Sequence, residues 1–424
     1  MTDSPPLPRR KYTATLGGMA SYIDGTTLVS LGTAVVLFRD QLHISAWGIG
    51  ALVAALQLSF ATGAVIGGRL GDLFGRRAVY SVDLLVYAAG ALIIVLSPNQ
   101  ATLFTGVIVT GLAMGADVPT SLALVFEEAD DGQGGSAVAY CQTLLLAGVV
   151  VTQIIGFVVA DMGALGARLL FVHPLVVAIV VWILRRKVDE SAAWEKACAL
   201  PRAAERRNLK AVFSQTSGVA MVATALFYVA TAMTPNTVGQ FSTYLITTLS
   251  HSTTRTATVV GLLGVLVSVA AALLFQRLVD TPGRGAVFAL GLVTLVLGPL
   301  VCVIAGFSLW SVVVMMVIIS IGSPCAGEGI YKVWTQEIFP TEIRGTAQGL
   351  TYGVARFATA GFSLLTPALA TGSPTTLMLV LSGLSVLAAA VGLLWIPRLT
   401  RHGDSGSGAE AATLSAATPP LEKA

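Results

Sequence analysis

The amino-acid sequence predicts an all-α fold, that of a polytopic membrane protein with twelve transmembrane helices in two pseudo-symmetric six-helix bundles. Only 11% of the 424 residues are charged and the mean hydropathy is +0.81, whereas about a quarter of a soluble domain is charged. The charged residues fall between apolar runs of about 20 residues, the length with which a helix crosses hydrocarbon. These runs lack the alternation of barrel strands, so helices are expected.

Apolar windows between polar, glycine or proline breaks define six spans in each half of the chain. The expected spans are 12–38, 47–66, 78–97, 101–126, 137–160 and 168–184, then 217–249, 257–276, 286–306, 309–335, 346–370 and 375–396. The expected domains are a cytoplasmic N-terminus (1–11), an N-terminal bundle (12–184), a cytoplasmic linker (185–216), a C-terminal bundle (217–396) and a disordered cytoplasmic tail (397–424). No small-residue cleavage site follows the basic start, so we expect the first span to be retained.

The distribution of basic residues predicts the orientation. Most of the 25 Lys and Arg residues lie on the side that would carry both termini, and only Arg39, Arg168 and Arg255 fall in the opposite loops. By the positive-inside rule both termini should be cytoplasmic. We therefore expect a multi-pass protein of the bacterial inner membrane.

An internal repeat supports the division into two halves. The segment Arg69–Arg76 (RLGDLFGR) recurs as Arg277–Arg284 (RLVDTPGR), displaced by 208 positions. Both copies fall between the second and third span of their half. This is a parallel repeat about an axis along the membrane normal, and it predicts a solute site between the halves.

The first copy of the repeat resembles the loop motif G-x-x-x-D-x-x-G-R-R/K of the major facilitator superfamily. It appears as Gly68, Asp72, Gly75, Arg76 and Arg77. The resemblance implies a transporter in which these residues latch the cytoplasmic face. Glycines permit the tight turn, and the Asp and Arg side chains can bind helix ends and opposing carboxylates. These charges could also serve only to cap helices and orient the chain.

Further motifs resemble the sugar porters and metabolite:proton symporters of that superfamily, over nearly all of residues 12–396. Glu337–Gly345 resembles E-x-F-P-x-x-x-R-G, Glu190–Trp194 resembles E-S-x-x-W, and Arg168 with Phe171 fits R-x-x-F. Glu127 precedes Glu337 by 210 positions, which would make it a partner of the loop arginines. The implied gate residues are Gly68, Asp72, Gly75, Arg76, Arg77, Glu127, Asp280, Gly283, Arg284, Glu337 and Arg344.

The sequence departs from the sugar porters at positions that matter for coupling and binding. The arginine of their fourth span falls on Val107, and the stacking tryptophan of their tenth span falls on Lys332. Their tandem glutamines fall on Ala230 and Thr231.

Three charged residues are expected deep in the membrane. Asp24 lies about eleven residues into the first span, roughly 16 Å at 1.5 Å per residue, and a carboxylate there is suited to proton coupling. A fixed ion pair with Arg356 is the alternative. Arg356, also at mid-depth, needs a carboxylate from the protein or the solute. Lys332 could bind substrate or be neutralised by Glu328, one helical turn before it.

Polar residues at helical spacing predict the wall of a substrate cavity. Asn236, Gln240 and Tyr244 would share one face of the seventh span, and Gln142 matches a sugar-porter glutamine in the fifth. Each could instead bond to a neighbouring helix. We also expect Gly25 and Pro235 to mark matching interruptions of spans one and seven.

The predicted function is proton-coupled symport of a small polar metabolite, a sugar, polyol or organic acid, by alternating access. A proton-driven drug or metabolite efflux antiporter is the alternative, although the span-five efflux motif is missing, and a non-transporting membrane sensor is another. The scattered histidines His43, His173, His251 and His402 offer no catalytic or metal-binding arrangement. We expect no enzyme activity, cofactor, metal or nucleic acid, and a monomer in the lipid bilayer whose partners are the small-molecule substrate and a proton.

Overall fold

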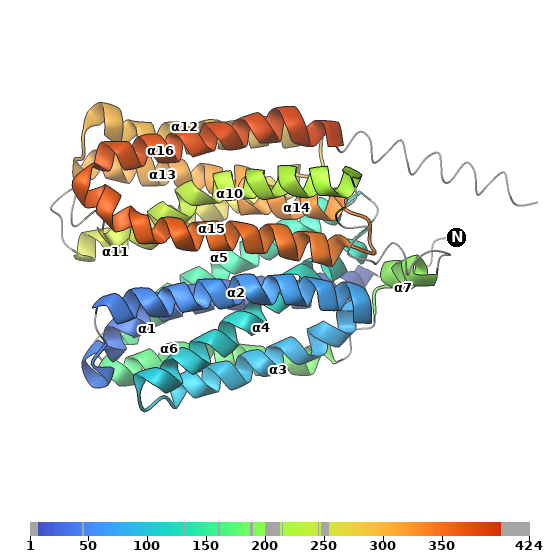
Figure 1. Cartoon of the computed structure of the whole chain (residues 1–424), viewed down its shortest axis with the longest axis horizontal. Coiled ribbons are helices and arrows are strands. Elements are labelled where there is room, and N and C mark those ends of the chain that lie inside the picture. The colour runs from blue at the N-terminus through green and yellow to red at the C-terminus, as the bar shows by residue number, and fades with distance from the viewer. Residues whose placement is uncertain are drawn as a thin grey trace, which may run out of the picture.

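The structure is a computed structural model that describes residues 7–44, 46–130, 132–159, 162–186, 190–199, 213, 215–244, 246 and 254–399. Throughout this described part the chain forms helices and turns without a strand, which confirms the all-α fold. The helices run along the long axis of the molecule in two bundles (Figure 1).

The first bundle contains the six helices α1 to α6, and the short helix α7 follows it. Their bounds are α1 (Leu7–Leu42), α2 (Ala46–Phe74), α3 (Arg76–Val95), α4 (Gln100–Glu127), α5 (Gly134–Val159), α6 (Gly163–Arg185) and α7 (Ala192–Ala199). The second bundle contains α10 (Gln215–Tyr244), α11 (Thr254–Leu278), α12 (Arg284–Ala305), α13 (Leu309–Ala326), α14 (Glu328–Ile338), α15 (Arg344–Gly372) and α16 (Pro374–Ala390), continued by the π-helical η2 (Val391–Trp395).

Ten described helical stretches are long and apolar enough to cross a membrane by length and composition. Helices α1 and α15 are not among these ten, and both contain polar side chains that are buried inside the protein. Helix α1 buries Asp24 and Ser30, and α15 buries Arg356 and Thr366. The outer surface is apolar: Ile304 and Phe157 are 85% and 81% exposed, as expected of side chains that face lipid tails.

Helix α13 ends and α14 begins at Gly327, inside the single span expected at 309–335. Pro324 in α13 lacks the N–H that would bind the carbonyl of Ser320. The hydroxyl of Ser268 in α11 donates to that carbonyl at 3.1 Å, and Thr231 of α10 donates to the carbonyl of Ala326 at 2.7 Å. The break is therefore satisfied by neighbouring helices, as apolar surroundings require.

The interruptions expected at Gly25 and Pro235 do not occur, because α1 and α10 run continuously through both positions. The break at Gly327 is the one that shapes the site, since it places Glu328 in the first turn of α14.

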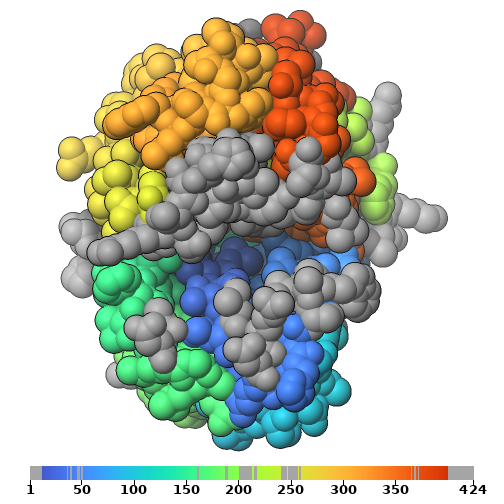
Figure 2. Space-filling model, turned by 90° about the vertical axis from the view of Figure 1, so that its left-hand side faces the viewer, coloured from blue at the N-terminus to red at the C-terminus, as the bar shows by residue number. Residues whose placement is uncertain are grey.

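The two bundles meet along α2 against α15 and along α5 against α11 and α14. Gly68 and Gly349 allow the first contact: a β-carbon on Gly68 would meet the carbonyl of Gly345, and one on Gly349 would meet the carbonyl of Ala64. We call the end with the α2–α3 and α11–α12 turns the basic-loop end; α7 lies there too, on the right in Figure 1. Figure 2 views the opposite end, with helices of the first bundle below and of the second above.

Candidate functional site

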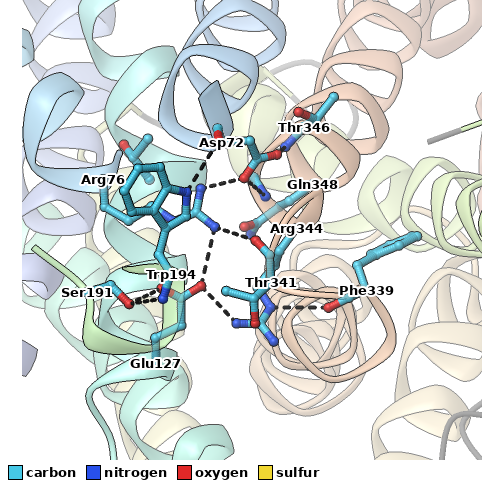
Figure 3. Close-up of polar contacts among 12 residues, drawn as sticks. Asp72, Arg76, Glu127, Ser191, Trp194, Phe339, Thr341, Arg344, Thr346 and Gln348 are labelled. Atoms are coloured by element: carbon cyan, nitrogen blue, oxygen red, sulfur yellow. Dashed lines mark hydrogen bonds and ion pairs between the residues drawn. The ribbon is translucent and has the colours of Figure 1, made fainter. Parts of the chain in front are cut away.

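At the basic-loop end, Asp72 joins the two bundles. The last turn of α2 carries this carboxylate, which accepts hydrogen bonds from the backbone N–H groups of Gly345 at 3.1 Å and Thr346 at 2.5 Å. These N–H groups belong to the first turn of α15, which has no intrahelical partners for them. Asp72 also forms a fully buried ion pair with Arg76 (Figure 3). Asp72 is thus an N-cap supplied by the opposite half.

Glu127, at the end of α4, is the second centre of this contact. Its carboxylate lies 3.3 Å from Arg76 and 2.9 Å from Arg344 of the opposite half, and it accepts a hydrogen bond from the Ser191 hydroxyl at 2.5 Å. Arg76 also donates to the carbonyl of Thr341 at 2.8 Å. The structure thus brings Asp72, Arg76, Glu127 and Arg344 into one buried cluster (Figure 3).

Local backbone geometry places Arg76 in this cluster. Gly75 has a φ of 98°, a conformation that residues with a β-carbon rarely adopt, and it turns the chain from α2 into α3. The Glu190 carboxylate then accepts from the N–H groups of Arg76 at 2.9 Å and Arg77 at 3.1 Å. Glu190 therefore caps α3, while the Arg76 side chain turns toward Asp72.

The repeat builds a corresponding contact from the second half. Asp280 accepts a hydrogen bond from the backbone N–H of Ser136, in the first turn of α5, at 2.6 Å. Arg284 binds Glu337 through two hydrogen bonds of 2.8 and 2.9 Å. Gly283 contributes the turn before α12 and has an ordinary negative φ of −70°.

A buried charge cluster lies in the second bundle, next to its contact with the first. Glu328 of α14 forms ion pairs with Lys332 at 2.8 Å and with Arg356 of α15 at 3.7 Å. The Tyr352 hydroxyl donates to Glu328 at 2.9 Å and accepts from Arg356 at 2.5 Å. One carboxylate therefore partners two cations, and the expected pairing of Glu328 with Lys332 is present.

Lys332 reaches across to the first bundle. It is completely buried, and its Nζ donates to the amide oxygen of Gln142 in α5 at 3.4 Å. Asp24 is 4% exposed and interacts electrostatically with Lys332, Arg356, Glu328 and Asp117. Within the described residues no hydrogen bond or ion pair fixes the Asp24 carboxylate, so the alternative of a direct pair with Arg356 is not realised.

The expected cavity wall on α10 is described only in part. The Asn236 amide donates to the carbonyl of Ala232 in its own helix at 2.8 Å. The side chains of Gln240 and Tyr244 lie outside the described residues.

Aromatic residues that the sequence did not single out surround the cluster. The rings of Tyr228 and Tyr331 stack with centroids 4.0 Å apart, and the Arg356 guanidinium lies 5.1 Å from the centroid of Phe60 in α2. No spacing rule links these residues, because they come from α10, α14 and α2. For Tyr352 a sequence signal existed: it lies four residues before Arg356, one helical turn away, where the two side chains can meet.

A separate charge cluster stabilises the first bundle. Arg185, at the end of α6, pairs with Asp117 at 3.0 Å and Asp83 at 3.5 Å, and its guanidinium lies 3.6 Å from the ring centroid of Tyr80. These buried contacts join α3, α4 and α6 within the first bundle.

Comparison with known proteins gives consistent matches. A family model described as Major Facilitator Superfamily matches residues 14–361. The minor myo-inositol transporter IolF of Bacillus subtilis (strain 168) is 29% identical over 392 residues, covering 89% of each chain. The putative metabolite transport protein YaaU of Escherichia coli (strain K12) is 23% identical over 376 residues, covering 81% of this chain and 82% of its own.

Solved structures share the fold. The proton:xylose symporter XylE bound to 6-bromo-6-deoxy-D-glucose superposes with a TM-score of 0.79, covering 92% of this chain and 96% of XylE at 16% identity. At this identity the likeness concerns the arrangement of helices.

Proposed function

The chain belongs to the Major Facilitator Superfamily, and from that premise we propose that it is a proton-coupled symporter of a neutral polyol or sugar. The two bundles rock about a central site bounded by α1, α5, α10, α14 and α15. Asp24 carries the coupling proton. Gln142, Asn236, Gln240, Tyr244, Lys332 and Arg356 are the proposed substrate-binding residues.

The observation that carries this substrate class is that both central cations already have a carboxylate partner within the protein. An organic anion needs a cation that lacks a carboxylate partner. Lys332 and Arg356 both pair with Glu328 instead, and Arg356 also binds the Tyr352 hydroxyl. The remaining N–H donors of Lys332 and Arg356, together with the Gln142 amide, can form hydrogen bonds with the hydroxyl groups of a neutral substrate. The likeness to a myo-inositol transporter supports the same class.

Asp24 is suited to coupling because it is buried without a fixed partner, between charges of both signs. Its carboxylate can change protonation without breaking an ion pair, and its charge acts on Lys332 across the two halves. A proton bound at Asp24 therefore alters the attraction between the bundles at the substrate site.

Orientation follows from the loop charges. We propose that the basic-loop end faces the cytoplasm of a bacterial plasma membrane, with both termini on that side. On this proposal, the contacts of Asp72, Arg76, Glu127 and Arg344 close the protein toward the cytoplasm. The residues proposed for this gate also include Gly68, Gly75, Arg77, Asp280, Gly283, Arg284 and Glu337.

The test is accumulation by proteoliposomes under an imposed inward proton gradient, with a pH-sensitive dye inside. Glucose and glucuronate form a matched pair that differs by one carboxylate, and myo-inositol and xylose complete the panel. We expect accumulation of a neutral member together with internal acidification. Preferred uptake of glucuronate would overturn the substrate class. Loss of a preloaded dye under the opposite gradient would instead establish the efflux antiporter.

A further inference from the structure

Gln57, near the middle of α2, is a buried polar side chain outside the charge clusters described above. Only 5% of it is exposed. Its amide oxygen Oε1 is fully buried and has no hydrogen-bond partner in the part of the chain that the structure describes. Buried polar groups without a partner are rare, because they have given up their hydrogen bonds to water and gained none in return. Gln57 is therefore placed to bind a group that the protein itself does not supply.

The packing of α2 against α15 shows which part of the second bundle Gln57 faces. A β-carbon on Gly349 would meet the carbonyl of Ala64. One helical turn further along α15, a β-carbon on Gly353 would meet the carbonyl of Ala61. One turn back along α2 thus corresponds to one turn forward along α15. Gln57 lies four residues before Ala61, on the same face of α2. It is therefore opposite the turn of α15 that follows Gly353.

That turn of α15 contains Arg356. The contacts of Phe60, three residues after Gln57 on α2, agree with this placement. The ring centroid of Phe60 lies 5.6 Å from that of Tyr352 and 5.1 Å from the guanidinium carbon of Arg356. The Nε atom of Arg356 is also buried without a hydrogen-bond partner among the described residues. The two halves thus bring an unpartnered acceptor from α2 and an unpartnered donor from α15 to the same depth of their interface.

We propose that Gln57 is a further substrate-binding residue, whose Oε1 accepts a hydrogen bond from a solute hydroxyl group while Arg356 Nε donates to the same hydroxyl or to its neighbour. A hydroxyl group fits both atoms, because it donates one hydrogen bond and accepts others. A carboxylate accepts from Arg356 but offers Gln57 no donor. The inference rests on the proposed transport of a neutral polyol or sugar, and it makes α2 a wall of that site. Such a solute joins α2 and α15 across the two halves.

The experiment measures equilibrium binding of myo-inositol, glucose and xylose to the purified full-length protein by calorimetry, without a proton gradient. Gln57→Met removes the amide and keeps an unbranched side chain of similar length. We expect it to raise the dissociation constant of the bound solute about three- to tenfold, which corresponds to the loss of one neutral hydrogen bond. The melting temperature of the solute-free variant should not fall, because the amide oxygen has no partner among the described residues to lose.

Ser59→Ala is the matched control in the same helix. The Ser59 hydroxyl is buried but donates to the carbonyls of Ala55 and Leu56 in its own helix, so its removal should leave the dissociation constant unchanged. Singly deoxygenated analogues of the bound solute give a second readout. One analogue should bind the parent about three- to tenfold more weakly than the solute does, whereas Gln57→Met should bind that analogue and the solute equally.

An unchanged dissociation constant in Gln57→Met would overturn the inference. So would a lower melting temperature of the solute-free variant, which would show that the amide is bonded within the protein. The symport proposal is tested separately: a solute that binds through Gln57 but is not accumulated with protons rejects proton coupling and keeps this contact. If none of the three neutral solutes binds, the proposed substrate class falls and this inference falls with it.

Discussion

Asp24 is the residue on which proton coupling should depend. It is buried at 4% exposure without a fixed partner among the described residues, so replacing it by an isosteric neutral amide should disturb the fold little. We expect Asp24→Asn to abolish proton-driven accumulation while solute exchange between the two faces continues. Counterflow and gradient-driven uptake, measured on the same proteoliposomes, check this. Undiminished uphill uptake in Asp24→Asn would remove Asp24 from the coupling role.

Glu328 is the residue on which the central cluster should depend for stability. Glu328→Gln leaves Lys332 and Arg356 buried without a full negative charge, and breaking a buried pair in this way costs about 3–5 kcal/mol. The matched control is Glu337→Gln, which removes a carboxylate from a partly exposed pair worth about 0–1 kcal/mol. Chemical unfolding of both variants measures the difference. Equal losses would show that the ion pairs of Glu328 with the two cations do not stabilise the protein.

The sequence predicted some of these residue contacts and missed others. The pair Glu328–Lys332 followed from helical spacing within one span. The contact of Glu328 with Arg356 did not, because it joins two helices and depends on the break at Gly327. The sequence alone showed that Lys332 and Val107 stand where the sugar porters have a tryptophan and an arginine. The sequence did not show that Lys332 would contact Gln142, because this contact depends on how α14 packs on α5.

At the scale of helices, the two aspartates at corresponding places in the repeat act as caps across the interface. Asp72 is fully buried and binds two N–H groups of α15 and Arg76, whereas Asp280 binds α5 from a partly exposed turn. Loss of a cap costs about 0.5–2 kcal/mol. We expect Asp72→Asn to change the maximal transport rate severalfold with little change in KM, and Asp280→Asn to change it less. Initial uptake rates against solute concentration test this, and a change confined to KM would contradict the gating role.

The helices themselves were largely predictable, because long apolar runs determine their existence. Their interruptions were less so. Gly25 and Pro235 were expected to break α1 and α10, yet both helices continue. Pro324 and Gly327, in contrast, do accompany an interruption of the helix, between α13 and α14. The difference lies in tertiary support, since Ser268 and Thr231 satisfy the carbonyl groups freed at that break, and a single sequence does not reveal such partners.

At the scale of the molecule, the repeat at 208 positions predicted two related halves and their parallel arrangement. It did not predict that Asp72 and Asp280 would each cap a helix of the other half. Nor did it predict the asymmetry of the equivalent glutamates: Glu127 pairs with Arg76 and Arg344, whereas Glu337 pairs with Arg284. These pairs depend on how the helix ends pack, which the repeat pattern does not contain.

If the two halves rock as rigid bodies, both helix pairs at this end open together. This can be distinguished from independent opening of each helix pair. Val333 of α14 is completely buried, and its side chain lies near the start of α5 at Gly135, beside the Asp280 cap. We would introduce Val333→Cys after replacing Cys141, Cys198, Cys302 and Cys325 by alanine. Each cap exists only while the basic-loop end is closed, so the loss of either cap should lower the free energy of opening, and the two effects should add. A cap worth about 1 kcal/mol should raise the labelling rate by a maleimide about fivefold.

The informative variant is Asp72→Asn, whose cap lies on the other helix pair, α2 with α15. If the halves move as rigid bodies, Asp72→Asn should speed labelling of Val333→Cys, and the factors for Asp72→Asn and Asp280→Asn should multiply in the double variant. If each helix pair opens independently, only Asp280→Asn should have an effect. Comparing the labelling rates of the four proteins therefore decides whether the two caps report one opening of the whole molecule, which transport by alternating access requires.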